Sequence, residues 1–248
     1  MNSVLVILGY DALEYEVVMK FKNKTMVQQR FGKTNLDGFS EPRTMVIWTS
    51  FLTGRNTEQE ALAGDLWNFK VTKEETFFSH FKSHVAIDVP GYTYDDEDHA
   101  LNRKLMKECM EKTCSVEDYD KQCFDHHKKV KQQFFAALDS TCKNKREGKP
   151  HTEIIMGYFA LPDTVGHISF GVEQKMRLVY DEMERITKDV SSRSEVDTIL
   201  IISDHGMYPI GRFGDHSRYG FWSLNKDVDL GVPNPVDLKK IILSLAKK

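Results

Sequence analysis

The 248-residue sequence lacks a long apolar run and a strong excess of charge of either sign. Its 34 basic and 37 acidic side chains give a net charge of −3, so no electrostatic argument favours a nucleic acid polymer or an anionic membrane as the main partner. The apolar run near the N-terminus is too short to span a bilayer, and it lacks the basic flank and small-residue cleavage site of a signal peptide. We therefore expect a cytoplasmic protein that does not associate with membranes.

Cysteine is scarce as well. The sequence has four cysteines, and none of them forms the C-x-x-C pair that is typical of a structural zinc site. They are Cys109, Cys114, Cys123 and Cys142. Free thiols are the default in a reducing cytosol, so we assign these residues no function.

Four short runs of β-branched and apolar residues predict buried strands, at residues 3–8, 84–89, 152–158 and 198–202. Helical patterns separate these runs. Such an alternation is typical of an α/β fold with a doubly wound, mainly parallel sheet flanked by helices. We therefore predict a single domain over residues 1–248, with ligands bound beyond the C-terminal ends of the strands.

The composition shifts between residues 95 and 148, where Lys, Glu, Asp and Cys accompany apolar residues at helical spacing. We interpret this segment as a small helical cap inserted into the domain rather than as a second domain. Its charged side chains predict mainly a solvated face, but a cap above the cleft would also be placed to shape substrate choice.

Carboxylates and imidazoles follow the predicted strands in four short motifs, G-Y-D-A-L, P-D-T-V-G-H, S-D-H-G-M and G-D-H-S-R. The six residues are Asp11, Asp163, His167, Asp204, His205 and His216. Three aspartates and three histidines form a mixed oxygen and nitrogen ligand set for two divalent cations, with zinc or manganese favoured. Two cations held roughly 4 Å apart suit in-line phosphoryl transfer.

Each ligand assignment has a plainer alternative. Asp11 is also placed to cap the following helix, Asp163 to cap a helix that exposes His167, and Asp215 to compete with its neighbour His216. The remaining histidines fit no ligand position, and we expect them to be structural or exposed. They are His80, His84, His99, His126, His127 and His151.

Residues 42–54 run from a proline-containing loop into a predicted helix that ends at a glycine. Thr44 would lie at the helix N-terminus, where free backbone N–H groups and the helix dipole favour negative charge. Its hydroxyl is a weak nucleophile that a divalent cation activates. The alternative is that Thr44 serves only as an N-cap, but the neighbouring ligand set favours the nucleophile.

Five motifs in a fixed order, between Val4 and Trp222, resemble the alkaline phosphatase superfamily. They are the Asp11 strand end, T-M-V-I-W-T-S-F-L-T-G from Thr44, D-T-V-G-H from Asp163, S-D-H-G-M, and G-D-H from Gly214. Their pattern is similar to the type I phosphodiesterase and nucleotide pyrophosphatase branch, and to its compact archaeal-type members. The resemblance implies an alkaline phosphatase-like fold. It also implies that Asp11, Thr44, Asp204 and His205 hold one metal, and that Asp163, His167 and His216 hold the other.

The resemblance further implies a function. It predicts a two-metal phosphodiesterase, with zinc or manganese, that hydrolyses a small phosphate ester such as a nucleotide through a phosphothreonine intermediate at Thr44. The alternatives are a phosphomonoesterase or phosphonate monoester hydrolase at the same site, and an inactive homologue that binds a metal or a nucleotide. No cysteine lies in the C-x-P-x-R pattern of a sulfatase.

Three further residues are expected to bind substrate. Arg43 and Arg55 flank the helix that begins at Thr44, and either is placed to reach a phosphate. Asp65 stands where secreted nucleotide pyrophosphatases place an asparagine that binds a phosphate oxygen. A carboxylate there would repel a second negative charge, which favours a diester over a monoester.

Overall fold

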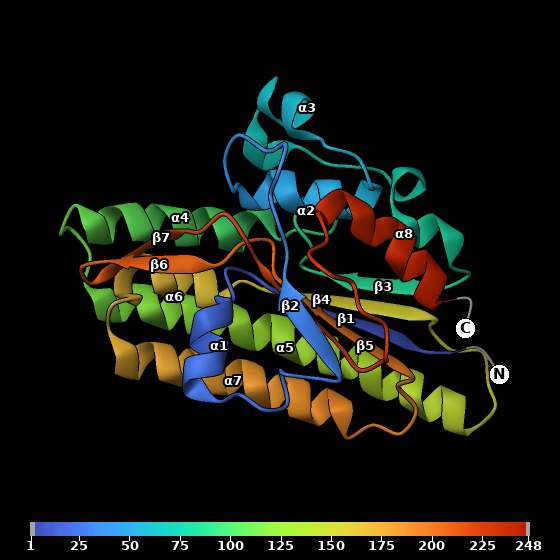
Figure 1. The fold of residues 1–248 in the computed structure, drawn as a ribbon. Coiled ribbons are helices and arrows are strands. Elements are labelled where there is room, and N and C mark those ends of the chain that lie inside the picture. Colours follow the sequence, from blue (N-terminus) through green and yellow to red (C-terminus); the bar gives the residue numbers. More distant parts are fainter. Residues whose placement is uncertain (1–2, 247–248) are drawn as a thin grey trace.

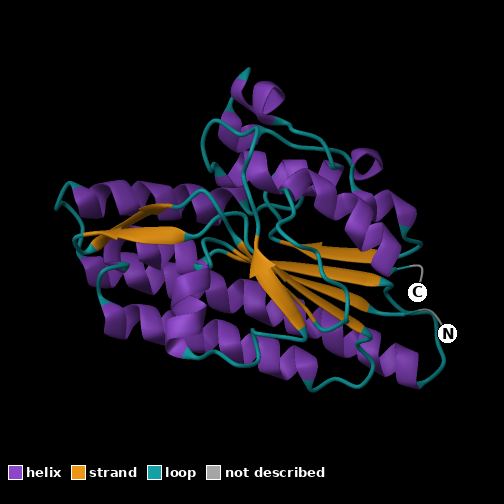
Figure 2. Ribbon diagram, in the orientation of Figure 1, coloured by secondary structure: helices purple, strands orange, loops and turns teal. Residues whose placement is uncertain are grey.

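The computed structural model describes residues 3–246. It contains a six-stranded sheet with the order β2-β8-β5-β1-β4-β3 between two layers of helices (Figures 1 and 2). The strands are β1 Leu5–Tyr10, β2 Arg30–Lys33, β3 His84–Ile87, β4 Ile154–Phe159, β5 Thr198–Ile202 and β8 Phe221–Leu224. β1, β3, β4 and β5 are parallel, while β8 is antiparallel to both β5 and β2. This mixed, mainly parallel sheet confirms the predicted fold class.

Helices cover both faces of the sheet. One face packs against α1 Tyr15–Phe21, α5 Val116–Arg146, α6 Leu161–Ser169 and α7 Glu173–Ser191. The other packs against α2 Thr44–Thr53, α8 Pro235–Leu245 and the 3₁₀ turn η3 Phe77–His80. The remaining helical elements are α3 Glu58–Leu62, α4 Asp96–Met110, η1 Leu66–Asn68 and η2 Lys73–Glu75. None of the helices within residues 3–246 is long and apolar enough to cross a membrane.

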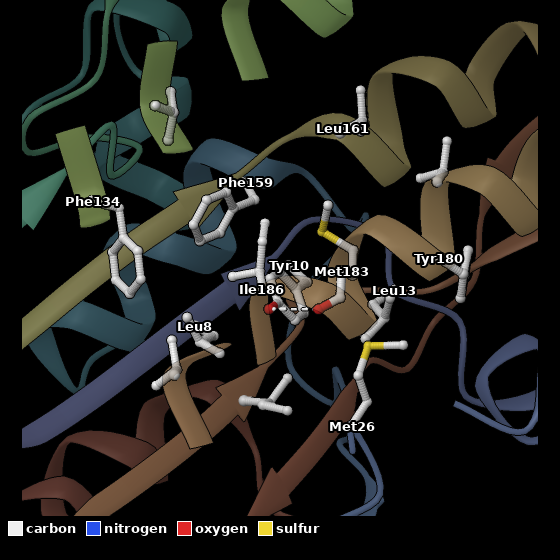
Figure 3. Packing of buried hydrophobic residues seen from close by; sticks show 14 of the residues in the cluster. Leu8, Tyr10, Leu13, Met26, Phe134, Phe159, Leu161, Tyr180, Met183 and Ile186 are labelled. Atoms are coloured by element: carbon white, nitrogen blue, oxygen red, sulfur yellow. Dashed lines mark hydrogen bonds between the residues drawn. The ribbon is translucent and has the colours of Figure 1, made fainter. Parts of the chain in front are cut away.

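The central strand β1 has no alternation of apolar and polar residues, because both of its faces are buried. Leu8 and Tyr10 of β1 point toward the layer of α5 and α7, where Phe134 and Phe159 also lie (Figure 3). The Tyr10 hydroxyl donates a hydrogen bond to the Met183 carbonyl. Leu5 and Ile7 point to the opposite layer. A parallel strand buried on both faces needs apolar side chains at every position, and all six residues of β1 are buried.

Four predicted strands occur, but the sequence analysis missed four others. β2 and β8 join the sheet by antiparallel pairing, and a separate hairpin consists of β6 Met207–Ile210 and β7 Phe213–His216. β2 is partly or fully exposed along its length, and three of the four residues of β6 are exposed. β2, R-F-G-K, has no apolar run, and β6, M-Y-P-I, is short and contains a proline, which argues against a strand.

The predicted cap segment forms the two helices α4 and α5. α5 packs on β4 and β3, where Phe134 and Leu138 are fully buried, so this helix belongs to the layer that covers the sheet. α4 packs on α5 and α6 at the edge where the strands end. Asn102, Arg103 and Met106 of α4 line a pocket there. The role of α4 as a cap stays a prediction.

Candidate metal centre

Three neighbouring parallel strands end at the edge where the predicted ligands lie. β1 lies between β4 and β5 and is parallel to both. Asp11 directly follows β1, Asp163 lies in the first turn of α6 after β4, and Asp204–His205 follow β5. Because the C-terminal ends of parallel strands lie at the same edge of the sheet, residues that follow these strands lie together although they are far apart in the sequence.

The hairpin β6–β7 returns the sixth predicted ligand to this edge. β6 begins directly after the D-H-G motif, and its residue Met207 pairs with His216 at the end of β7. As a result the rings of His205 and His216 stack, with 3.8 Å between their centroids. The ligand atoms of Asp163, His205 and His216 lie within 4.8 Å of one another. The six residues therefore form two adjacent groups.

The first group consists of Asp11, Asp204 and His205, all buried. His205 Nε2 lies 3.5 Å from Asp11 Oδ1 and 3.2 Å from Asp204 Oδ2. These three buried atoms have no hydrogen-bond partner within residues 3–246. The other oxygens are occupied, since the Tyr158 hydroxyl donates to Asp11 Oδ2 and the Ala12 N–H to Asp204 Oδ1.

These distances fit a bound cation. A tetrahedral zinc ion with ligands at about 2.0–2.1 Å places neighbouring ligand atoms about 3.3 Å apart. Leaving three polar atoms buried and unpaired would be unfavourable by several kcal/mol, whereas a cation would pair all three at once.

Electrostatics at the first group support the same conclusion. Burial, and then the charge of Asp204, raise the pKa of Asp11 well above its usual range. Burial raises the pKa of Asp204 to about 7, with a further contribution from Asp163. Burial also holds the pKa of His205 well below its usual range, so this imidazole is neutral and able to coordinate. Two buried carboxylates this close need a positive charge between them if both are to ionise.

The second group consists of Asp163, His167 and His216. Asp163 Oδ1 lies 3.2 Å from the Nε2 atom of each histidine, and the two Nε2 atoms are 3.1 Å apart. All three distances are close to the tetrahedral zinc value of about 3.3 Å. These side chains are 13–20% exposed, so this group opens toward the pocket.

Backbone carbonyls orient the three imidazoles. His216 Nδ1 lies 2.9 Å from the Pro42 carbonyl, and His205 Nδ1 lies 3.1 Å from the Gly206 carbonyl. His167 is hydrogen-bonded to the backbone of Gly214. A carbonyl only accepts, so Nδ1 of His205 and His216 carries a proton, and Nε2 is the nitrogen that faces the centre, as in metal-ligating histidines.

The plainer alternatives do not match the geometry. α1 is capped by the Glu14 side chain, not by Asp11. The His167 side chain is 80% buried and faces Asp163 instead of solvent. Asp215 accepts from the Tyr208 hydroxyl and from the backbone N–H of His216, so its carboxylate turns away from the second group.

Thr44 lies beside both groups. It is the first residue of α2, and Arg43 occupies the N-cap position without a side-chain cap hydrogen bond to any described residue. The N–H groups of the first turn therefore have neither an intrahelical nor a side-chain cap partner. Thr44 lines the pocket together with Asp11, Asp163 and His167. The N-cap alternative for Thr44 is thus not observed.

The structure does not bring two of the expected substrate-binding residues to the pocket. Arg55 follows the C-terminus of α2, about 15 Å along the helix from Thr44, and forms ion pairs with Glu60 and Glu75. Asp65 is exposed and caps η1 by accepting from the Trp67 N–H at 3.1 Å. Neither is among the described residues that line the pocket. Trp67, two residues after Asp65, does line the pocket, so the chain passes close to it but the Asp65 carboxylate caps η1 instead.

Arg43 does lie at the pocket, and sequence reasoning missed two of its neighbours. The inner part of the pocket is lined by Asp11 and Asp163, and the outer part by His216 and Arg218. Arg43 lines the outer part and pairs with Glu41 at 2.7 Å. Trp67 and Arg103 line both the inner and the outer part, and the Arg103 guanidinium lies 4.0 Å from the Trp67 ring. Arg103 Nη1 is buried and has no partner within residues 3–246. No local pattern distinguishes Arg103 from the solvated charges around it.

Glu14 is a further residue that sequence reasoning missed. It is buried, and its carboxylate accepts from the Met207 N–H at 3.0 Å, the Ser217 hydroxyl at 3.1 Å and the Tyr219 hydroxyl at 2.6 Å. These bonds tie the chain after β5 to the chain after β7. Glu14 therefore holds together the segments that carry the two ligand groups.

The glycine of the D-H-G motif is required by this contact. A Cβ atom at Gly206 would lie 2.1 Å from Glu14 Oε2, so Gly206→Ala must displace the carboxylate or the turn that carries His205. We expect a loss of about 1–3 kcal/mol in unfolding free energy and weaker zinc binding, measured by urea denaturation and zinc titration. Gly64→Ala is the control, because a Cβ there meets nothing within 4 Å. Equal values for the two variants would contradict this role of Gly206.

Comparisons with known proteins agree with this geometry. The chain matches the model of the family described as type I phosphodiesterase / nucleotide pyrophosphatase over residues 5–220. No curated protein matches the chain by sequence.

Solved structures with the same fold include several enzymes. The alkaline phosphatase from the Antarctic bacterium TAB5 shares 11% identity, with a TM-score of 0.55 over 99% of this chain and 98% of that chain. A variant of that phosphatase was solved with magnesium bound. A 2-O GAG sulfatase shares 10% identity, with a TM-score of 0.56 over 100% of this chain and 71% of that chain.

A murine ectonucleotide pyrophosphatase / phosphodiesterase 5 shares 15% identity over 85% of this chain, with a TM-score of 0.47. This chain covers 59% of the murine protein's length. At such identities the structural likeness shows the fold alone, and the assignment depends on the family match. The chain therefore belongs to the type I phosphodiesterase and nucleotide pyrophosphatase family, and it is a phosphoric ester hydrolase.

Proposed function

We propose that the chain is a two-metal phosphodiesterase in which Thr44 is the nucleophile. The observation that carries this proposal is the set of three buried atoms without partners, Asp11 Oδ1, Asp204 Oδ2 and His205 Nε2, next to a second group with the same spacing. A binding protein without catalytic metals would have no need to keep such atoms buried and unpaired.

The donor set suits two zinc ions. Asp11, Asp204 and His205 would hold one ion together with Thr44, and the second ion would take Asp163, His167 and His216. Two such ions supply charge neutralisation for the attacking and leaving oxygens of an in-line displacement at phosphorus.

The residues of the chain provide the nucleophile and orient the phosphate. The Thr44 hydroxyl loses its proton and attacks phosphorus, so that a threonine O–P bond forms while the bond to the leaving oxygen breaks. The leaving group takes up a proton, and water then cleaves the threonine O–P bond of the ester that remains on Thr44, which releases a phosphate monoester and restores the hydroxyl. The N–H groups in the first turn of α2 point toward the same place and favour the negative charge of the phosphate.

The charge at the pocket favours a singly charged diester over a doubly charged monoester. Arg43 pairs with Glu41 through one terminal nitrogen, and Arg218 donates to two backbone carbonyls, so both cations are partly engaged. Asp215 adds a negative charge at the outer part. Arg43 Nε and Arg103 Nη1 are buried N–H groups at the pocket that no described residue accepts. Each further negative charge on the substrate needs a matching hydrogen-bond donor or cation. Binding a charge without such a partner in a partly dry site is unfavourable.

The first experiment compares bis-p-nitrophenyl phosphate with p-nitrophenyl phosphate, with and without a chelator. We expect kcat/KM to favour the diester and the activity on both esters to disappear on chelation, with recovery on adding zinc. A preference for the monoester would support the phosphomonoesterase alternative. Activity that survives complete metal removal would overturn the two-metal proposal.

Arg103→Ala tests how the pocket holds the phosphate ester. An ionic hydrogen bond contributes about 1.5–3 kcal/mol, so we expect KM for the diester to rise about 10- to 100-fold. Arg177→Ala is the matched control, because Arg177 also lies over an aromatic ring, that of Phe21 at 4.4 Å, but does not line the pocket. Michaelis–Menten kinetics on both variants provide the measurement. Unchanged KM in Arg103→Ala would exclude Arg103 from substrate binding.

We also propose a cytoplasmic location. All four cysteines are free thiols, and two of them, Cys123 and Cys142, are buried. Free thiols that persist in a folded enzyme favour a reducing compartment. Thiol titration of the protein purified from its host under air-free conditions would test this location, and disulfides formed in the cell would contradict it.

A further inference from the structure

A third group of potential metal ligands lies at the end of β3, apart from the two groups already described. Asp88 directly follows β3, His99 lies on α4 and His126 lies on α5, and each is 3–5% exposed. Asp88 Oδ2 lies 2.9 Å from His99 Nε2 and 3.2 Å from His126 Nε2. The sequence analysis expected both histidines to be structural or exposed. They are buried, and the packing of α4 on α5 brings them onto one carboxylate oxygen.

Two atoms in this group are buried without a partner within the described residues. They are His126 Nε2 and the side-chain oxygen of Asn102. The Asn102 amide nitrogen lies 3.0 Å from His126 Nδ1. A half-turn of the amide would place its oxygen there instead, so that Nδ1–H donates to Asn102 and the Nε2 lone pair faces Asp88. This is the arrangement in which a histidine binds a metal through Nε2, with its other nitrogen held by an acceptor.

The Asp88 carboxylate is fixed in place. Asp88 Oδ1 accepts from the Asp95 N–H at 2.9 Å, which leaves Oδ2 for the histidines. The Asp88 backbone is left-handed, with φ of 59°. Stacking on Tyr94, with 3.7 Å between ring centroids, fixes the plane of His99.

The group has its own access from solvent. Asp88 and His126 line an opening whose rim carries Asp95, Asp96 and Glu97. One cation at this rim, Lys129, is paired with Asp95 and Asp98. An acidic rim favours the entry of a cation toward the buried carboxylate.

The group shares no residue with the other two. Tyr158 lies between them, since its ring centroid is 6.0 Å from that of His99 while its hydroxyl donates to Asp11. A cation at Asp88 would therefore be a separate ion with its own affinity.

We propose that Asp88, His99 and His126 bind one additional divalent transition-metal ion, for which zinc matches the two nitrogens and one oxygen best. Three protein ligands leave one position for water. The ion would join the end of β3 to α4 and α5 and so hold the pocket wall that Asn102 and Arg103 of α4 form. This inference does not depend on the proposed phosphodiesterase activity.

The test is a comparison of bound zinc in matched variants. Protein stripped with chelator is dialysed against zinc alone, and bound metal is measured by mass spectrometry. We expect His126→Gln to bind one zinc per chain fewer than the wild type. His127→Gln is the control, because His127 is the neighbouring buried histidine on α5 but contacts Glu182 at 3.3 Å instead. It is expected to bind as much zinc as the wild type.

A second variant covers the case in which His126→Gln fails to fold. Asp88→Asn keeps the shape of the side chain and a hydrogen-bond acceptor but removes the charge, and it is also expected to lose one zinc per chain. Thermal unfolding with and without zinc gives an independent readout, in which zinc raises the Tm of the wild type more than that of either variant. Equal zinc content in wild type, Asp88→Asn and His126→Gln would overturn the proposal and leave a hydrogen-bonded structural group. That result would leave the two-metal centre untouched, because only the difference between variants tests this site.

Discussion

Replacing Thr44 by alanine is expected to lower kcat on bis-p-nitrophenyl phosphate by roughly 10³-fold or more. The variant loses the oxygen that would form the bond to phosphorus, while the six carboxylate and imidazole ligands and the N–H groups of α2 remain. Substrate affinity and zinc content should therefore change far less than turnover. Steady-state kinetics, equilibrium binding of a non-hydrolysed diester and metal analysis on the same preparation separate these effects.

Two further variants make this result specific. Thr44→Ser keeps a hydroxyl and should retain partial activity. Thr53→Ala removes a threonine from the other end of the same helix, where the hydroxyl donates to the Thr49 carbonyl at 2.8 Å, and should stay within a few-fold of wild type. If Thr44→Ala kept more than a few per cent of the wild-type rate, water would have to be the nucleophile.

The fold class and the positions of the strand-end residues could be predicted because both are encoded locally. Asp11, Asp163 and Asp204 each follow an apolar run, and a parallel sheet brings the ends of such runs to one edge. No knowledge of the distant packing is needed for that step. The roles of the individual ligands stay predictions until metal is measured.

Residues that depend on long-range packing could not be predicted in this way. β2 joins the sheet by pairing Arg30 with Leu224, and its own four residues carry no strand signal. Arg103 faces the pocket only because α4 packs on α5 and α6. The same packing brings His99 and His126 together from two helices, without any motif that joins them.

For Asp65 the expectation rested on its position relative to a motif, and the structure does not place this residue in the lining of the pocket. Its distance from Thr44 in the sequence suggests a phosphate contact, but Asp65 is exposed and lies at the start of η1. Its two oxygens accept from the Trp67 N–H and the Asn68 amide. Capping of η1 is therefore a sufficient reason for an aspartate at position 65, without any contact to substrate.

Asp204→Asn is expected to remove one zinc from the centre and nearly all turnover. Asp204 Oδ2 is buried, faces His205 Nε2 at 3.2 Å and has no other partner among the described residues, so its charge has no function in the fold without a cation. The loss in zinc affinity should exceed the roughly 10- to 100-fold that follows loss of a group that only orients a ligand. Asp227→Asn is the control, since Asp227 is exposed, pairs with Arg30 and does not line the pocket.

The difference in unfolding temperature between Asp204→Asn and the wild type should depend on whether metal is bound. In zinc, the wild type is expected to unfold at the higher temperature, because it binds the ion more tightly in the folded state. In chelator, Asp204→Asn should unfold at the same or a higher temperature than the wild type, because it no longer buries a second carboxylate beside Asp11. Calorimetry in the two buffers measures both values. An ordinary structural aspartate would give a less stable variant in both buffers, and that outcome would remove Asp204 from the metal centre.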